Sequence, residues 1–308
     1  MTGRRRGGGV RAGVCAVAAL LLAPWISWTT HEQADPLLGV SLADLGLSGK
    51  VAIVVVETAV IYQAPSGPIE GPRMVRETMT FADDGLLREW RQYGVPGGPG
   101  LVHRYTYADG LLALEEVLNE EESLVEQSVY THEGGGTRTT VELRGSRGEL
   151  KGTTVYERDA AGKLLVVSEF DAVGSLASKL VYTYESGEER ADRYDGAENL
   201  LSWSIKKYDA KGNLVEVSLH SQGGGDSPFT TTYEVDAHGN VTLEETTGQV
   251  TLGFILLTPP PSKMSYEYTY DDVGNWTKRV KSVGVAGEDD PHWRETEVTY
   301  RRIVYQDA

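Results

Sequence analysis

Cysteine and basic charge are scarce in this 308-residue sequence, and each scarcity excludes a class of function. The single cysteine, Cys15, lies in an apolar run near the N-terminus. If that run is removed on export, the mature chain has no disulfide, no thiolate metal site and no cysteine nucleophile. The formal net charge is −16, so the chain lacks the basic surface that nucleic acid and anionic lipid require. We therefore predict no nucleic-acid partner.

Motifs of catalysis and cofactor binding are also missing. The six histidines are scattered, and none pairs with another at a metal-ligand spacing. No Gly-x-Ser-x-Gly elbow occurs, and the Gly-rich stretches lack the lysine and the strand-to-helix context of a phosphate loop. The sequence therefore predicts no catalytic residue, no cofactor and no metal, and it favours a protein that is not an enzyme.

The N-terminus has the layout of an export signal. Four arginines within residues 4–11 precede an apolar run over 14–26, which is too short to span a bilayer comfortably. We expect a signal peptide or N-terminal anchor over 1–30, a linker over 31–50 and one domain over 51–308. The protein is then exported to the periplasm, the cell surface or the exterior, and an uncleaved anchor remains the alternative.

A turn signature returns along the chain, and it indicates a repeat array. The clearest copies are Tyr208–Leu214, Val235–Val241 and Tyr270–Trp276, in which Asp is followed by Gly three residues later and Asn four residues later. Aspartate accepts backbone hydrogen bonds, glycine supplies positive φ and asparagine tolerates the left-handed region, so each copy predicts the tip of a β-hairpin. The residues to which we assign this structural role are Asp159, Gly162, Asp171, Gly174, Asp209, Gly212, Asn213, Asp236, Gly239, Asn240, Asp271, Gly274 and Asn275.

Between the turns, apolar and polar residues alternate with a period of two, as in Leu180, Tyr182 and Tyr184. Val51–Tyr62 predicts a buried strand, and Pro65–Pro72 predicts a loop. The predicted fold is all-β: an antiparallel hairpin-repeat meander of roughly fifteen or more strands in a strongly twisted or curled sheet, which either stays open or closes toward a barrel or partial shell. The edges of an open sheet would favour self-association.

The motif Tyr-Asp-x-x-Gly-Asn resembles the YD repeat of the RHS-like family. The copies ending at Leu214, Val241 and Trp276 carry the resemblance, and weaker copies extend upstream to Phe81. The resemblance implies a β-hairpin array that coils into a curved sheet or shell, and an extracytoplasmic habitat. This chain is far shorter than the shells that enclose a toxin.

Aromatic residues are the best candidates for ligand contact. Trp90, Trp203, Trp276 and Trp293, with Tyr93, are able to present a stacking surface, although packing between strands explains many such residues. Our first hypothesis is an exported, non-enzymatic scaffold of the cell envelope or exterior that binds a glycan or an envelope protein. The alternatives are a secreted hydrolase that acts on polysaccharide through paired carboxylates, and a partial cage or partner for a toxin.

Overall fold

The computed structural model describes residues 40–94, 100–222, 228–248, 250–252, 255–257, 262–285 and 293–306. The expected signal over 1–30 and the first part of the expected linker, residues 31–39, lie outside these residues. Among the residues described, no helix is long and apolar enough to cross a bilayer.

The described part of the chain folds mainly into β-strands, as the sequence predicts. One 3₁₀ turn, Gly134–Gly136, is the only helical element among the described residues. The strands are β1 (Val51–Ala64), β2 (Gly67–Glu70), β3 (Met74–Phe81), β4 (Leu87–Gln92), β5 (Leu101–Ala108), β6 (Leu111–Asn119), β7 (Leu124–Glu133), β8 (Arg138–Gly145), β9 (Leu150–Arg158), β10 (Leu164–Asp171), β11 (Leu176–Glu185), β12 (Glu188–Asp195), β13 (Leu200–Tyr208), β14 (Leu214–Ser221), β15 (Phe229–Val235), β16 (Val241–Thr247), β17 (Val250–Leu252), β18 (Ile255–Leu257), β19 (Ser262–Tyr270), β20 (Trp276–Val285) and β21 (Arg294–Tyr305).

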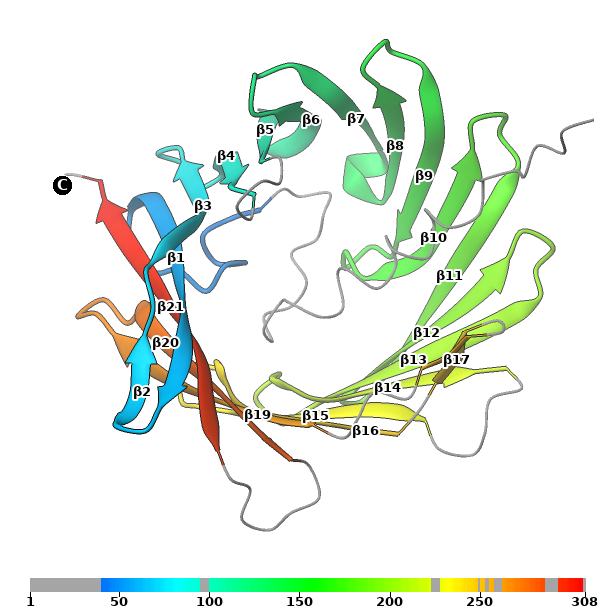
Figure 1. Cartoon of the computed structure of the whole chain (residues 1–308). Helices are drawn as coiled ribbons and strands as arrows, with labels where there is room; N and C mark the ends of the chain where they lie inside the picture. Colours follow the sequence, from blue (N-terminus) through cyan, green and yellow to red (C-terminus); the bar gives the residue numbers. More distant parts are fainter. Residues whose placement is uncertain are drawn as a thin grey trace, which may run out of the picture.

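The sheet closes into a barrel (Figure 1). Consecutive strands pair antiparallel around the ring, β16 pairs with β19, and β1 pairs with the last strand, β21, over residues 51–60. Eighteen strands form the ring, while β2 extends from β1 and β17 with β18 forms a separate hairpin. Because the first and last strands of the meander pair with each other, the ring has no free edge strand through which a second copy could pair.

One predicted loop contains a strand. The segment predicted as a loop, Pro65–Pro72, includes β2, which pairs with the second half of β1. Pro68 is opposite Gln63 in this short hairpin. Proline has no backbone N–H, and a strand outside the continuous ring tolerates its loss better than a central strand does.

The repeated turn has one geometry wherever it occurs. The first residue donates its N–H to the carbonyl four residues later, and the fourth donates to the carbonyl of the first. This pattern occurs at 82–86, 119–123, 145–149, 159–163, 171–175, 195–199, 209–213, 236–240 and 271–275. In the aspartate copies, Oδ1 also accepts the N–H groups two and four residues later, as Asp209 does at 2.8 and 2.9 Å.

The turns occupy both ends of the barrel. Strand order places Asp159, Asp209, Asp236 and Asp271 at one end, which we call the first rim, and Asp171 and Asp195 at the other, the second rim. The hairpin turns at 133–136 and 186–189, which lack the aspartate signature, lie at the first rim as well. The turn signature therefore identifies hairpin turns, but it does not indicate at which end of the barrel a turn lies.

Residues 40–50, which we call the strap, lie inside the ring beside β1 (Figure 1, blue). Leu47 of the strap packs in the main hydrophobic cluster with Val54, Met79 and Tyr105. Since directly paired residues share a face, this contact identifies the inward face of every ring strand. Leu180, Tyr182 and Tyr184 belong to that face, because the pairs Val167–Leu180 and Tyr182–Ala191 continue it around the ring.

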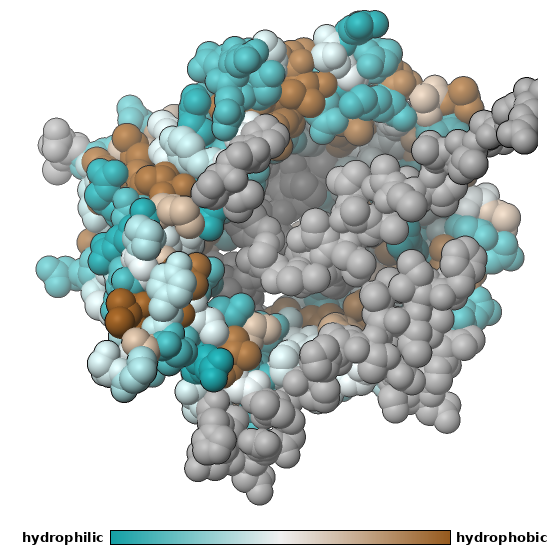
Figure 2. Space-filling view, viewed as in Figure 1, coloured by the Kyte–Doolittle hydropathy of each residue, from teal (hydrophilic) through white to brown (hydrophobic). Residues whose placement is uncertain are grey.

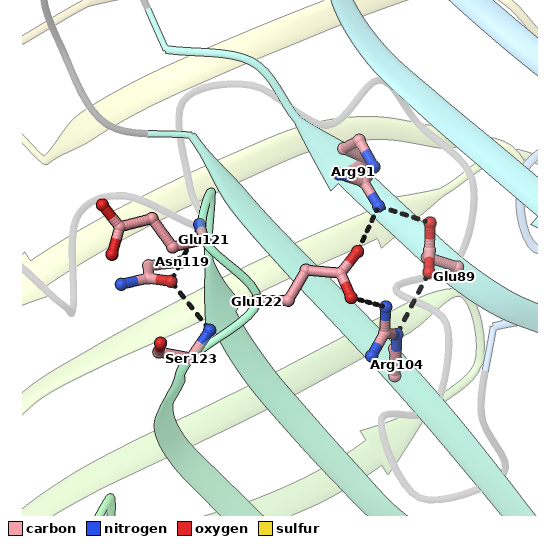
Figure 3. A network of polar contacts seen from close by, with 7 residues as sticks. All are labelled: Glu89, Arg91, Arg104, Asn119, Glu121, Glu122 and Ser123. Atoms are coloured by element: carbon pink, nitrogen blue, oxygen red, sulfur yellow. Dashed lines mark hydrogen bonds and ion pairs between the residues drawn. The ribbon is translucent and has the colours of Figure 1, made fainter.

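The outward face is charged. Figure 3 shows Arg91, Arg104, Glu89 and Glu122 joined on the outside of β4, β5 and the β6–β7 turn, with Arg104 to Glu122 at 3.1 Å. Similar outward pairs are Arg144–Glu142, Lys207–Glu216 and Lys263–Glu245. Hydrophilic residues occur around the outer edge of the ring (Figure 2). Charged side chains on this face are compatible with contact with water, whereas charged side chains that face lipid are destabilising.

Candidate functional site

The four candidate tryptophans do not form one surface. Trp90 and Trp276 face inward, on β4 and β20. Trp203 faces outward, where its ring stacks on His220 at 5.0 Å between centroids. Trp293 lies just before β21 with 42% of its surface exposed. Only the two inward tryptophans therefore share a sector of the wall, which runs from β19 through β20, β21, β1 and β3 to β5.

A pocket of about 340 Å³ lies in this sector, near the second rim. Its lining is Arg76, Glu77, Gln92, Tyr93, Gly94 and Leu101. Ligand pockets for small molecules start at roughly 300 Å³, so one sugar ring or a small peptide side chain fits. Tyr93 is 43% exposed, and its N–H donates to the Arg76 carbonyl at 2.8 Å, which fixes the backbone beneath the phenol ring.

Glu77 connects the pocket to the inward tryptophans. The Trp90 indole N–H donates to Glu77 Oε2 at 3.2 Å. Burial raises the pKa of Glu77, and the Trp90 hydrogen bond and the charge of Arg301 oppose that rise. Val56 pairs with Arg301 on one side and with Glu77 on the other, so both side chains lie on the same inward face, two strands apart.

Two arginines gather beside Trp276. The Arg301 guanidinium carbon lies 3.6 Å from the centroid of the Trp276 ring, and that of Arg279 lies 5.6 Å from it. Burial, reinforced by the like charge of Arg279, lowers the pKa of Arg301 to about 9. Within the described part of the chain, Nε and Nη1 of Arg301 and Nε of Arg279 are buried without a hydrogen-bond acceptor. Buried polar groups in folded proteins are normally paired, so this cluster is exceptional.

Among the described residues, the Tyr268 hydroxyl, opposite Arg279, is buried without a hydrogen-bond partner as well, whereas several other inward polar groups are paired. His103 Nδ1 lies 3.0 Å from Glu115 Oε1, and the Tyr130 hydroxyl donates to the other oxygen of Glu115 at 3.4 Å. A second pocket of about 170 Å³ at the first rim includes His132, whose two ring nitrogens bond Thr139 and the Leu112 carbonyl. The described residues include no group of three or more metal-ligating side chains placed to bind an ion.

The residues assigned to the repeated turns all lie in turns. Gly162, Gly174, Gly212, Gly239 and Gly274 have φ between +82° and +93°, a region that suits glycine. Asn275 differs from the other turn asparagines because its side chain is fully buried and binds the strap.

Sequence reasoning missed Glu77, Gln92, Arg279 and Arg301. The alternation within Lys278-Arg279-Val280-Lys281 indicates which residues share a face, but not which face is inward. A bulge beside the turn, between Thr269 and Tyr270 in the pairing of β19 with β20, further obscures the face. Tyr93 and Trp90 were identified from their residue type alone.

No protein-family model matches the sequence, and no curated protein matches it. Among solved structures, a porin-like protein from Bacteroides uniformis ATCC 8492 aligns with 82% of this chain and 96% of its own, at 10% identity and a TM-score of 0.43. A porin-like protein from Bacteroides vulgatus ATCC 8482 aligns with 85% and 100%, at 9% identity and a TM-score of 0.26. The TcdB2-TccC3 structure aligns with 80% of this chain and 18% of its own, at 11% identity and a TM-score of 0.20. None of these similarities is close enough to assign a function.

Proposed function

We propose that this protein is an exported, non-enzymatic barrel that binds a glycan on its inward wall, as an interaction scaffold of the cell envelope or exterior. The pocket between β3, β4 and β5 is the observation that carries the proposal. It combines an exposed aromatic ring with amide, carboxyl and guanidinium groups. Aromatic faces stack on the C–H faces of sugars, and convergent polar groups bind the hydroxyls.

The export signal expected over 1–30 and the charged outward wall support the location. The shared geometry of the turns supports a further part of the proposal, that the chain is a short YD-repeat protein. In such a barrel the repeats build the wall, and side chains at inward positions that differ between hairpins supply the specificity.

The experiment is a binding screen on the exported chain with glycans and cell-envelope components, run beside a hydrolysis assay on the same panel. Tyr93→Ala and Gln92→Ala should weaken glycan binding at least about tenfold, the equivalent of one good contact. Trp203→Ala, on the outward wall, is the matched control and should bind as the wild type does.

The alternatives predict other outcomes. Turnover of a polysaccharide that Glu77→Gln abolishes would replace the scaffold with a hydrolase. Absence of binding to every glycan, together with saturable binding of an envelope protein, would contradict a glycan ligand.

A further inference from the structure

The arginine cluster on β20 and β21 lies on the inward face of the wall, two strands away from Glu77 of the pocket lining. Arg301 is adjacent to Val56, and Val56 is adjacent to Glu77 of the pocket lining. Glu77, which lines the pocket, therefore lies on the same inward face as the two guanidinium groups. This step rests on the proposed function, because it concerns the same ligand.

The guanidinium groups have more donors than the protein fills. Arg279 donates from Nη2 to the Thr299 hydroxyl at 3.3 Å, while its Nε and two of the nitrogens of Arg301 remain without an acceptor among the described residues. The stacking of Arg301 on Trp276 supplies attraction for the charge but accepts no N–H. A bound anion would satisfy donors that are otherwise buried without a partner.

Neighbouring carboxylates do not serve this purpose. Glu77 accepts from the Trp90 indole, Glu244 accepts from the Tyr266 hydroxyl at 3.3 Å, and Glu297 accepts from Thr299 at 3.4 Å. In a chain with 45 acidic residues and 29 basic ones, two inward arginines that form no ion pair with any described residue are an unexpected arrangement. Arginine is also the side chain whose planar fork best fits a carboxylate or a sulfate group.

We infer that Arg279 and Arg301 form an oxyanion subsite, so that the ligand is an acidic saccharide whose carboxylate or sulfate group binds the two guanidinium groups while a sugar ring stacks at the neighbouring aromatic residues. A uronate and a sulfated sugar share this chemistry. The subsite accounts for the unfilled donors, and the pocket beside it accounts for the rest of the saccharide.

The test uses the exported chain, with calorimetric titration of tetragalacturonate as the acidic probe, a sulfated galactan tetrasaccharide as the second acidic probe and the unsulfated galactan tetrasaccharide as the neutral one. We expect an acidic probe to bind at least about tenfold more tightly than the neutral one, since charge-assisted hydrogen bonds exceed neutral ones. Arg301→Gln and Arg279→Gln should each remove most of this preference and leave affinity for the neutral probe unchanged. The probe that binds more tightly identifies the anion as carboxylate or sulfate.

A second measurement separates the subsite from the proposed function. Galacturonate and sodium sulfate are added during thermal unfolding of the wild type, Arg301→Gln and the outward control Arg190→Gln. If the anions raise the melting temperature of the wild type and of the control but not of Arg301→Gln, the anion subsite is supported. If, in addition, no oligosaccharide binds, the subsite stands and the proposed glycan function fails.

Equal affinity for acidic and neutral probes, unchanged by Arg301→Gln, would overturn the subsite and leave glycan binding intact. Absence of binding by any probe, with no stabilisation by either anion, would overturn both. Circular dichroism identifies a variant that fails to fold, and Arg279→Gln then tests the same subsite.

Discussion

Asn275 and Ser48 are joined by two hydrogen bonds. The Ser48 N–H donates to Asn275 Oδ1 at 2.7 Å, and Asn275 Nδ2 donates to the Ser48 carbonyl at 2.9 Å. Asn275 Nδ2 also donates to the Tyr305 hydroxyl at 2.7 Å. The last copy of the turn thus fastens the strap to the point where β21 meets β1, which is where the barrel closes.

Asn275→Ala should therefore destabilise the barrel by about 2–3 kcal/mol, because it leaves backbone groups of Ser48 without partners in a buried place. Urea unfolding followed by circular dichroism measures the change. Asn213→Ala is the matched control at the same turn position. Asn213 bonds Asp209 within its own turn, where water replaces the lost contact, so the loss there should stay below about 1 kcal/mol. Equal losses in the two variants would show that the strap contact adds no stability.

Asp209→Asn should change how stability depends on pH. Hydrogen bonds from the Asn213 side chain, then from backbone N–H groups, lower the pKa of Asp209. A carboxyl with a lowered pKa in the folded protein stabilises it above the ordinary aspartate pKa of about 3.9, and this contribution disappears as the pH falls through the folded pKa.

The Asp209→Asn variant should therefore unfold at a lower urea concentration than the wild type at pH 7. The difference between the two urea midpoints should be smaller at pH 3. Asn119 shows that an amide preserves the backbone part of the turn, since its Oδ1 accepts the N–H groups of Glu121 and Ser123 at 3.0 and 2.9 Å. A gap that stays constant between pH 7 and pH 3 would contradict the ionic contribution.

Glu198→Gly should stabilise the protein by about 0.5–1 kcal/mol. Glu198 occupies the glycine position of its turn with φ of +61°, a conformation that is unfavourable for a residue with a Cβ atom. Its ion pair with Lys179 is 3.8 Å long and its side chain is 70% exposed, so little is lost with the carboxylate.

Glu122→Gly is the comparison for that prediction. Glu122 has the same backbone conformation, with φ of +58°, but it pairs with Arg91 and Arg104 at 3.6 and 3.1 Å (Figure 3). The gain in stability from Glu122→Gly should therefore be smaller than that from Glu198→Gly, because these ion pairs are lost. Thermal unfolding measures the change in melting temperature of both variants. A melting temperature of Glu198→Gly below that of the wild type would contradict the relief of backbone strain.

The turns and the alternation of the strands could be predicted because both are local. Asp, Gly and Asn at fixed spacing encode the hydrogen bonds at Asp209, Asp236 and Asp271 without reference to distant residues. The copy at 119–123 was not predicted, because Asn119 stands where the motif has aspartate and Glu122 where it has glycine. The same backbone hydrogen bonds form there nevertheless.

Closure and the arginine cluster depend on residues far apart in the chain. Val56 meets Arg301 only because β1 pairs with β21, and nothing in either segment indicates that partner. The inward direction of Arg279 follows from the strap inside the ring, which identifies the face. The alternation in the sequence distinguishes the two faces of a strand, but only the closed ring shows which face points inward, toward the proposed ligand.

The comparison of Trp276→Phe with Trp203→Phe tests the central claim, that the inward wall is the binding surface, most directly. Equilibrium titration with the tightest-binding glycan of the screen should show at least about a fivefold loss of affinity for Trp276→Phe, since the phenyl ring is a weaker platform for Arg301. Trp203→Phe should bind as the wild type does. Loss of affinity confined to Trp203→Phe would place the ligand on the outward wall and contradict the account.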